Sequence, residues 1–74
     1  MTADEARKLR RYDHVRATTN GDYGYVTDYK ELPDMGFAFV QINWAPNGKT
    51  TLEWFMEWFN VNEMEHIVKE EGAL

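Results

Sequence analysis

Apolar and polar residues alternate most clearly between Phe37 and Trp44. The even positions are uniformly apolar: Ala38, Val40, Ile42 and Trp44. The odd positions are mixed and include Gln41 and Asn43. Successive side chains of a strand point to opposite faces, so this pattern predicts a half-buried strand. Its even positions should face the core, and Phe37 and Phe39 should lie on the outer face.

Turn sequences divide the first two thirds of the chain into further extended segments. Asn20-Gly21-Asp22, the stretch 32–36 and Pro46-Asn47-Gly48 combine residues that preset a turn or accept a positive φ. They predict strands over 12–18, 23–30 and 37–44 in a meander. Alternation then gives Val15, Ala17 and Val26 to the core. The outer face should carry His14, Arg16, Tyr25, Thr27 and Tyr29.

The apolar residues between 50 and 61 fit both the spacing of a strand and the spacing of a helix. A strand would place four side chains on one side: Leu52, Trp54, Met56 and Trp58. A helix capped by Thr50 with Glu53 would align a different set: Leu52, Phe55, Met56 and Phe59. We favour the strand because the aromatic residues are common in strands and Asn60, Val61 and Asn62 are poor helix formers. The helix remains the alternative, and it would give an α+β fold with a three-stranded meander packed by a C-terminal helix.

The N-terminus has the spacing of a capping box, with Thr2 followed three residues later by Glu5. It predicts about two turns of helix over residues 3–11. A helix this short is marginal alone. It should therefore form only if Ala6 and Leu9 dock on the rest of the domain.

Four stretches form a further pattern: Tyr12-Asp13-His14-Val15-Arg16, Gly21-Asp22-Tyr23-Gly24-Tyr25-Val26, Phe39-Val40-Gln41-Ile42-Asn43-Trp44 and Trp58-Phe59-Asn60-Val61-Asn62-Glu63-Met64-Glu65. Together they resemble the small SH3-like β-barrels of the KOW and Tudor kinds. The resemblance covers about residues 12–69. It implies a mainly β fold, a barrel of about five strands with a 3₁₀ turn at residues 63–65 and a last strand over 66–69. The expected organisation is a helical, charged segment at 1–11, the barrel at 12–70 and a tail at 71–74.

Charge is distributed unevenly along the 74 residues, whose net charge is −5. Residues 1–16 hold five basic and three acidic side chains, whereas residues 17–74 hold three basic and ten acidic ones. A nucleic-acid binder needs clustered Lys and Arg on one face. Only the N-terminal segment offers such a cluster: Arg7, Lys8, Arg10, Arg11 and Arg16. Nucleic acid is thus a disfavoured partner, and a KOW-like nucleic-acid-associated domain is our alternative hypothesis.

The residues that most often carry catalysis or bind metals are scarce. The chain has no Cys and no Ser, and its two His residues, His14 and His66, are far apart in sequence. His66 beside Glu63 and Glu65 is more simply a solvated face than a metal site. We therefore predict a non-enzymatic protein without cofactor, metal or small-molecule substrate. The charged opening and the absence of a long apolar stretch predict a cytoplasmic protein without a membrane partner.

Exposed aromatic residues are the strongest functional signal. We predict a partner surface on the outer face made of Tyr25, Tyr29, Phe37 and Phe39, rimmed by Asp28, Glu31 and Asp34. Aromatic centres with charged rims are typical of protein interfaces. The surface should bind a basic protein partner or a second copy of the chain, unless the N-terminal helix or residues 50–61 cover it. Small acidic proteins of this kind also occur among phage-encoded inhibitors of host machinery, which is an analogy of size and charge.

A second arrangement of rings is a cage for a methylated ammonium group, made of Tyr23, Tyr25, Phe37 and Trp44. Core packing or cross-strand pairing explains most of these rings more simply.

Overall fold

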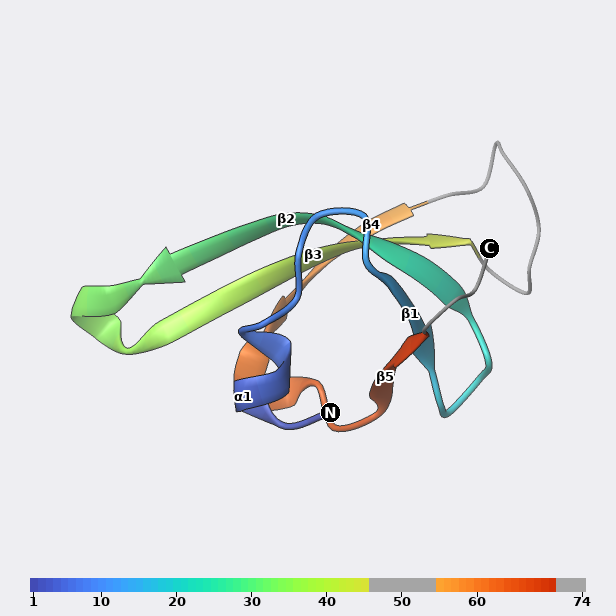
Figure 1. Cartoon of the computed structure of the whole chain (residues 1–74), viewed down its shortest axis with the longest axis horizontal. Coiled ribbons are helices and arrows are strands. Elements are labelled where there is room, and N and C mark those ends of the chain that lie inside the picture. Colours follow the sequence, from blue (N-terminus) through green and yellow to red (C-terminus); the bar gives the residue numbers. More distant parts are fainter. Residues whose placement is uncertain (46–54, 71–74) are drawn as a thin grey trace.

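A computed structural model describes residues 1–45 and 55–70, and it shows one antiparallel sheet of five strands (Figure 1). The strand order is β4-β3-β2-β1-β5. The strands are β1 (His14–Ala17), β2 (Tyr23–Leu32), β3 (Phe37–Ala45), β4 (Phe55–Asn60) and β5 (Ile67–Glu70). The short helix α1 (Ala3–Ala6) precedes them, and two 3₁₀ turns are η1 (Pro33–Met35) and η3 (Val61–Glu63). The predicted mainly β class with an N-terminal helix is confirmed.

The strand prediction for the second half of residues 50–61 is also confirmed. Residues 55–60 pair with β3 along their whole length, from Trp44 opposite Phe55 to Phe39 opposite Asn60. The alternative C-terminal helix is therefore wrong for this part, and residues 50–54 lie outside the described residues. The 3₁₀ turn lies at Val61–Glu63, two residues earlier than the resemblance implied.

Strands β2 and β3 form a long hairpin whose far end extends away from the rest of the sheet (Figure 1). Its tip is η1, where Pro33 begins the turn and Gly36 ends it with a φ of 69°. Pro suits the first residue of such a turn, and a positive φ is easiest for Gly. The turn sequence thus acts as predicted, although β2 continues to Leu32.

A β-bulge interrupts the hairpin at Thr27. Val26 lies opposite Ile42, but the register then shifts, and Tyr29 lies opposite Val40. The Thr27 hydroxyl donates to the backbone oxygen of Gln41 at 3.2 Å. One extra residue reverses the parity of every later side chain. Tyr29 consequently packs against the core, and its predicted place on the outer face is wrong.

The core lies on the inner face of the sheet. All four even positions of β3 are buried there, as predicted, together with Val15 and Val26. Val61, Met64 and Ile67 close it from the η3 side. Ala6 and Leu9 are also buried, so the N-terminal segment docks as expected. The helix itself is shorter than predicted and ends at Ala6, although both hydrogen bonds of the Thr2–Glu5 capping box are present.

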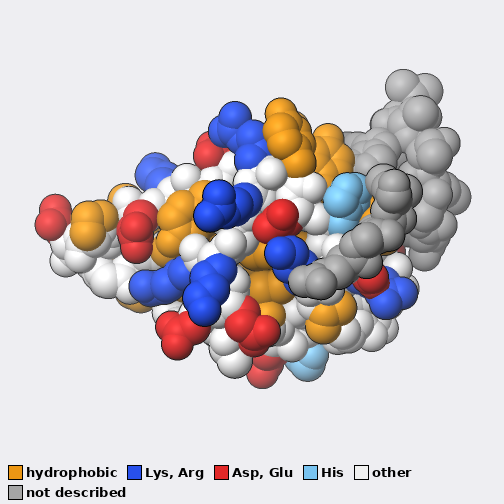
Figure 2. Space-filling model, in the orientation of Figure 1, with side chains coloured by type: hydrophobic (Ala, Val, Ile, Leu, Met, Phe, Trp, Pro, Cys, Tyr) orange, Lys and Arg blue, Asp and Glu red, His pale blue; other side chains and the backbone are white. Residues whose placement is uncertain are grey.

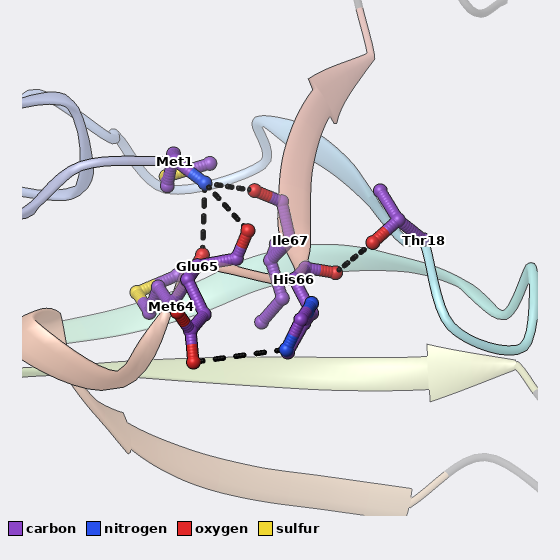
Figure 3. A network of polar contacts seen from close by, with 6 residues as sticks. All are labelled: Met1, Thr18, Met64, Glu65, His66 and Ile67. Carbon is purple, nitrogen blue, oxygen red and sulfur yellow. Dashed lines mark hydrogen bonds and ion pairs between the residues drawn. The ribbon is translucent and has the colours of Figure 1, made fainter.

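Polar contacts join the start of the chain to the connection before β5 (Figure 3). The Met1 nitrogen donates to the backbone oxygen of Met64 at 2.9 Å and to that of Ile67 at 2.6 Å. The Thr18 hydroxyl donates to the backbone oxygen of His66 at 3.1 Å. The Met1 bonds tie the N-terminus to the η3–β5 segment, and the Thr18 bond adds to the pairing of β1 with β5.

Candidate functional site

The predicted aromatic surface is divided in the structure. Tyr29 belongs to the inner face, as described above. Tyr25 does lie on the outer face, where its hydroxyl accepts a hydrogen bond from Asn43 Nδ2 at 3.0 Å. Tyr25 is opposite Asn43, six residues along β3 from Phe37, which corresponds to about 20 Å of strand. Only Phe37 and Phe39 remain together, and Phe37 is 39% exposed whereas Phe39 is half-buried.

The three predicted rim carboxylates are equally dispersed. Asp28 lies on the outer face opposite Gln41, and its Oδ1 is 3.8 Å from the Arg11 guanidinium. Glu31 lies opposite the core residue Ala38, and Asp34 lies in η1 at the hairpin tip. The predicted residues therefore spread along the hairpin instead of forming one patch.

The aromatic cage is excluded by the two faces of the sheet. Trp44 is buried on the inner face, where its ring meets Phe59 edge-on at 6.1 Å between centroids. Tyr25 lies on the opposite face, beside the rings of Tyr12 and His14. Rings on opposite faces of one sheet cannot surround the same cation.

Two of the five basic N-terminal residues, Arg11 and Arg16, lie near acidic groups. Arg16 forms an ion pair with Glu70, and Arg11 lies near Asp28 as noted. Arg7 donates to the Gly36 backbone oxygen at 3.4 Å. Figure 2 shows Lys and Arg side chains intermixed with Asp and Glu on the face it displays. The segment is thus less of a uniform positive surface than its sequence suggests.

The largest exposed apolar side chains in one strand belong to β4, which the sequence did not single out as a site. Phe55 is 46% exposed, Met56 62% and Trp58 45%. Met56 and Trp58 lie on the outer face, opposite Asn43 and Gln41, and Phe55 lies on the inner face opposite Trp44. The strand period did place Met56 and Trp58 on one side. Alternation alone does not indicate that this side is exposed.

A pocket of about 270 Å³ opens on the inner side of β4. Apolar side chains form much of its wall: Ala17, Trp44, Phe55, Phe59 and Ile67. Three carboxylates also line it, those of Asp22, Glu57 and Glu63, with Thr19, Asn20 and His66 beside them. No Lys or Arg is among these lining residues of the described chain. The pocket therefore combines aromatic walls with negative charge.

Within residues 1–45 and 55–70, no group of three or more His, Asp or Glu side chains is placed to hold a metal ion. The same residues contain no helix that is long and apolar enough to span a membrane. Comparisons with protein-family models, curated proteins and solved structures gave no match.

Proposed function

We propose that this domain is a non-enzymatic protein-interaction module that binds a basic segment of a partner protein through β4. The observation that supports this proposal most directly is the exposure of Phe55, Met56 and Trp58 on one strand. Met56 and Trp58 share the outer face, and Phe55 lies on the inner face beside the pocket. Exposed apolar side chains that lie together on a surface often mark interaction sites. Trp and other aromatic residues also contribute disproportionately to binding energy at interfaces.

Charge supports a basic partner. The chain carries a net charge of −5, and three carboxylates line the pocket beside β4, those of Glu57, Asp22 and Glu63. Complementary potentials accelerate encounter and disfavour partners of the same sign. A segment rich in Lys or Arg would therefore be selected over an acidic one.

We also infer that the sheet is a variant of the SH3-like barrel. Three features support this: the return of β5 to pair with β1, the 3₁₀ turn between β4 and β5, and the burial of Met64 after that turn. Barrels of this kind host many unrelated functions, so the fold adds little to the functional argument.

The alternative, nucleic-acid binding through the N-terminal basic residues, has weaker support because Arg11 and Arg16 lie beside carboxylates. Phosphate binding releases counterions and must weaken steeply as salt rises. We expect affinity for duplex DNA or RNA no better than about 10⁻⁴ M at physiological salt. Micromolar binding that is lost in an Arg10→Ala, Arg11→Ala double variant would favour the alternative.

Two matched methionines test the protein-binding proposal. Met56 in β4 is 62% exposed and Met35 in η1 is 64% exposed, so Met→Ala removes a side chain of similar solvent exposure at each position. Tagged protein is used to capture partners from extracts of its native host, with quantification by mass spectrometry. Met56→Ala should deplete the specifically captured protein, and Met35→Ala should not. Equal capture by the unchanged protein and both variants would refute a role for β4.

A further inference from the structure

The two edges of the sheet differ in how well they are protected against pairing. The β5 edge is four residues long and carries Lys69 and Glu70. The β4 edge is six residues long, contains no Pro or Lys, and pairs with β3 without any register shift. Natural edge strands are commonly short, bulged, or marked with Lys, Pro or an inward charge. Among these devices β4 has only one, the inward-facing Glu57.

The free edge of β4 has no strand beside it within the described residues. A strand added there would meet two different faces. On the outer face it would lie beside Met56 and Trp58, and on the inner face beside Glu57, which is opposite the core residue Ile42. Cross-strand neighbours determine which strands pair well. In the added strand, the residue that faces Glu57 should therefore have an apolar residue on each side, one beside Met56 and one beside Trp58.

The pocket defines the chemistry of that central residue. Glu57, Asp22 and Glu63 line the pocket together with the rings of Phe55 and Phe59. Neither Glu57 nor Glu63 forms an ion pair with a described Lys or Arg. Lys and Arg bury an apolar stem while their charged heads stay near water or carboxylates. Such a side chain matches both the walls and the sign of the pocket.

A second copy of the chain matches less well. Antiparallel pairing of two β4 strands can place Met56 beside Trp58 of the second copy, but that register sets Glu57 opposite Glu57. Like charges directly opposite each other destabilise a sheet. The occupant favoured by charge is thus a different protein.

We propose that β4 accepts an extended strand of a partner protein, in which a Lys or Arg faces Glu57 and enters the pocket while its two neighbours contact Met56 and Trp58. This proposal rests on the proposed protein-binding function and specifies its mode. The recognised pattern is apolar, basic, apolar in an extended segment. Backbone hydrogen bonds to the β4 edge would supply affinity, and the alternate side chains would supply specificity.

The probe is the capped pentapeptide Thr-Val-Lys-Val-Thr, titrated into the full chain and followed by two-dimensional amide NMR. The indole resonance of Trp58 reports on the outer face, and that of Trp44 reports on the pocket. Both should shift saturably with one dissociation constant. Replacing the peptide Lys by norleucine should weaken binding about two- to fivefold, as loss of a partly exposed ion pair does.

Protein variants test the same charge from the other side. Glu57→Gln should reproduce the norleucine effect for the lysine peptide, and Glu31→Gln on the distant hairpin should have no effect. A peptide with Glu in place of Lys should bind Glu57→Lys better than it binds the unchanged protein. The dispersion of the amide spectrum shows whether each variant is folded.

A separate experiment tests whether the backbone of the peptide pairs with β4. Two N-methylated peptides are compared, one methylated at both Val residues and one at the Lys and the final Thr. Alternate N–H groups of a strand point to opposite sides, so strand addition predicts that only one of the two peptides loses binding. Binding by both methylated peptides would overturn strand pairing.

Other outcomes also overturn the proposal. Equal affinity for the lysine and norleucine peptides would show that binding does not require a basic residue opposite Glu57. Dimers of the free protein that dissociate on peptide addition, detected by analytical ultracentrifugation, would make a second copy the natural occupant. Absence of binding by every peptide at about 10 mM would reject this mode of recognition, while the comparison of Met56→Ala with Met35→Ala would still decide the proposed function independently.

Discussion

Gly24→Ala is expected to destabilise the domain, because the inner face of β2 has no room for a methyl group at this position. An added Cβ would lie 2.8 Å from Trp44 Cε3, 2.9 Å from Ile42 Cγ2 and 2.9 Å from the Asn43 backbone oxygen. Non-bonded carbon atoms prefer separations of about 3.5–4.0 Å. Trp44 and Ile42 are buried, and the Asn43 backbone is part of the β2–β3 pairing. None of the three neighbours can withdraw without disturbing the core or the sheet.

Overpacking of this kind costs about 1–3 kcal/mol. In a domain of this size each kcal/mol lowers the melting temperature by about 4–8 °C. Thermal and urea unfolding followed by circular dichroism measure the loss. The near-ultraviolet spectrum should also change, because Trp44 must shift relative to Phe59, whose ring it meets edge-on.

Gly21→Ala is the matched control. Gly21 has a φ of 77°, and an added Cβ would have no atom within 4 Å. Its cost should come from the left-handed backbone alone, about 1–2 kcal/mol, without a change in the tryptophan environment. A Gly24→Ala variant that melts within about 2 °C of the unchanged protein, or that leaves the near-ultraviolet spectrum unaltered, would refute the reasoning.

Further predictions concern the N-terminal cap, the core and metal dependence. Thr2→Ala should cost about 1 kcal/mol in urea unfolding, because it removes the side chain that caps α1. Hydrogen bonds from the Thr2 backbone and hydroxyl hold the pKa of Glu5 below its ordinary value. The stabilisation from this carboxylate should therefore be present above the ordinary pKa and lost as pH falls through the lowered one. Glu5→Gln should flatten that part of the stability profile measured by urea unfolding. Ile42→Ala should cost about 2–5 kcal/mol in the same assay, whereas Met35→Ala should stay within about 0.5 kcal/mol. A chelator should leave the melting temperature unchanged, and a lowered value would contradict metal-free folding.

The strand pattern was predictable where one period ran without interruption. Between Phe37 and Trp44 strict alternation gave the inner face correctly, because every even position is apolar. The same reasoning misplaced Tyr29. The bulge at Thr27 adds one residue to β2, and Thr27 looks like any other strand residue in the sequence. Periodicity cannot detect a residue that a partner strand skips.

The candidate site was less predictable than the fold. The sequence indicated that Met56 and Trp58 share a face, but their exposure depends on β4 being at the edge of the sheet. Strand order results from long-range pairing, which local turn and alternation signals do not contain. The pocket likewise brings together Asp22 in the β1–β2 turn, Glu57 in β4 and Glu63 in η3, positions that no short motif connects.

Glu57 is the carboxylate at the centre of the β4 edge, and its charge affects which strands can pair there. An apolar edge strand such as β4 can pair with copies of itself, since the same side chains that attract a partner also attract each other. One carboxylate at the centre of the strand opposes that pairing, because the register that joins Met56 to Trp58 brings two negative charges together. The same carboxylate favours a strand with a basic residue at that place. The residue that would keep the domain from assembling with itself is thus the residue that would select its partner, and neither role requires any change in the fold.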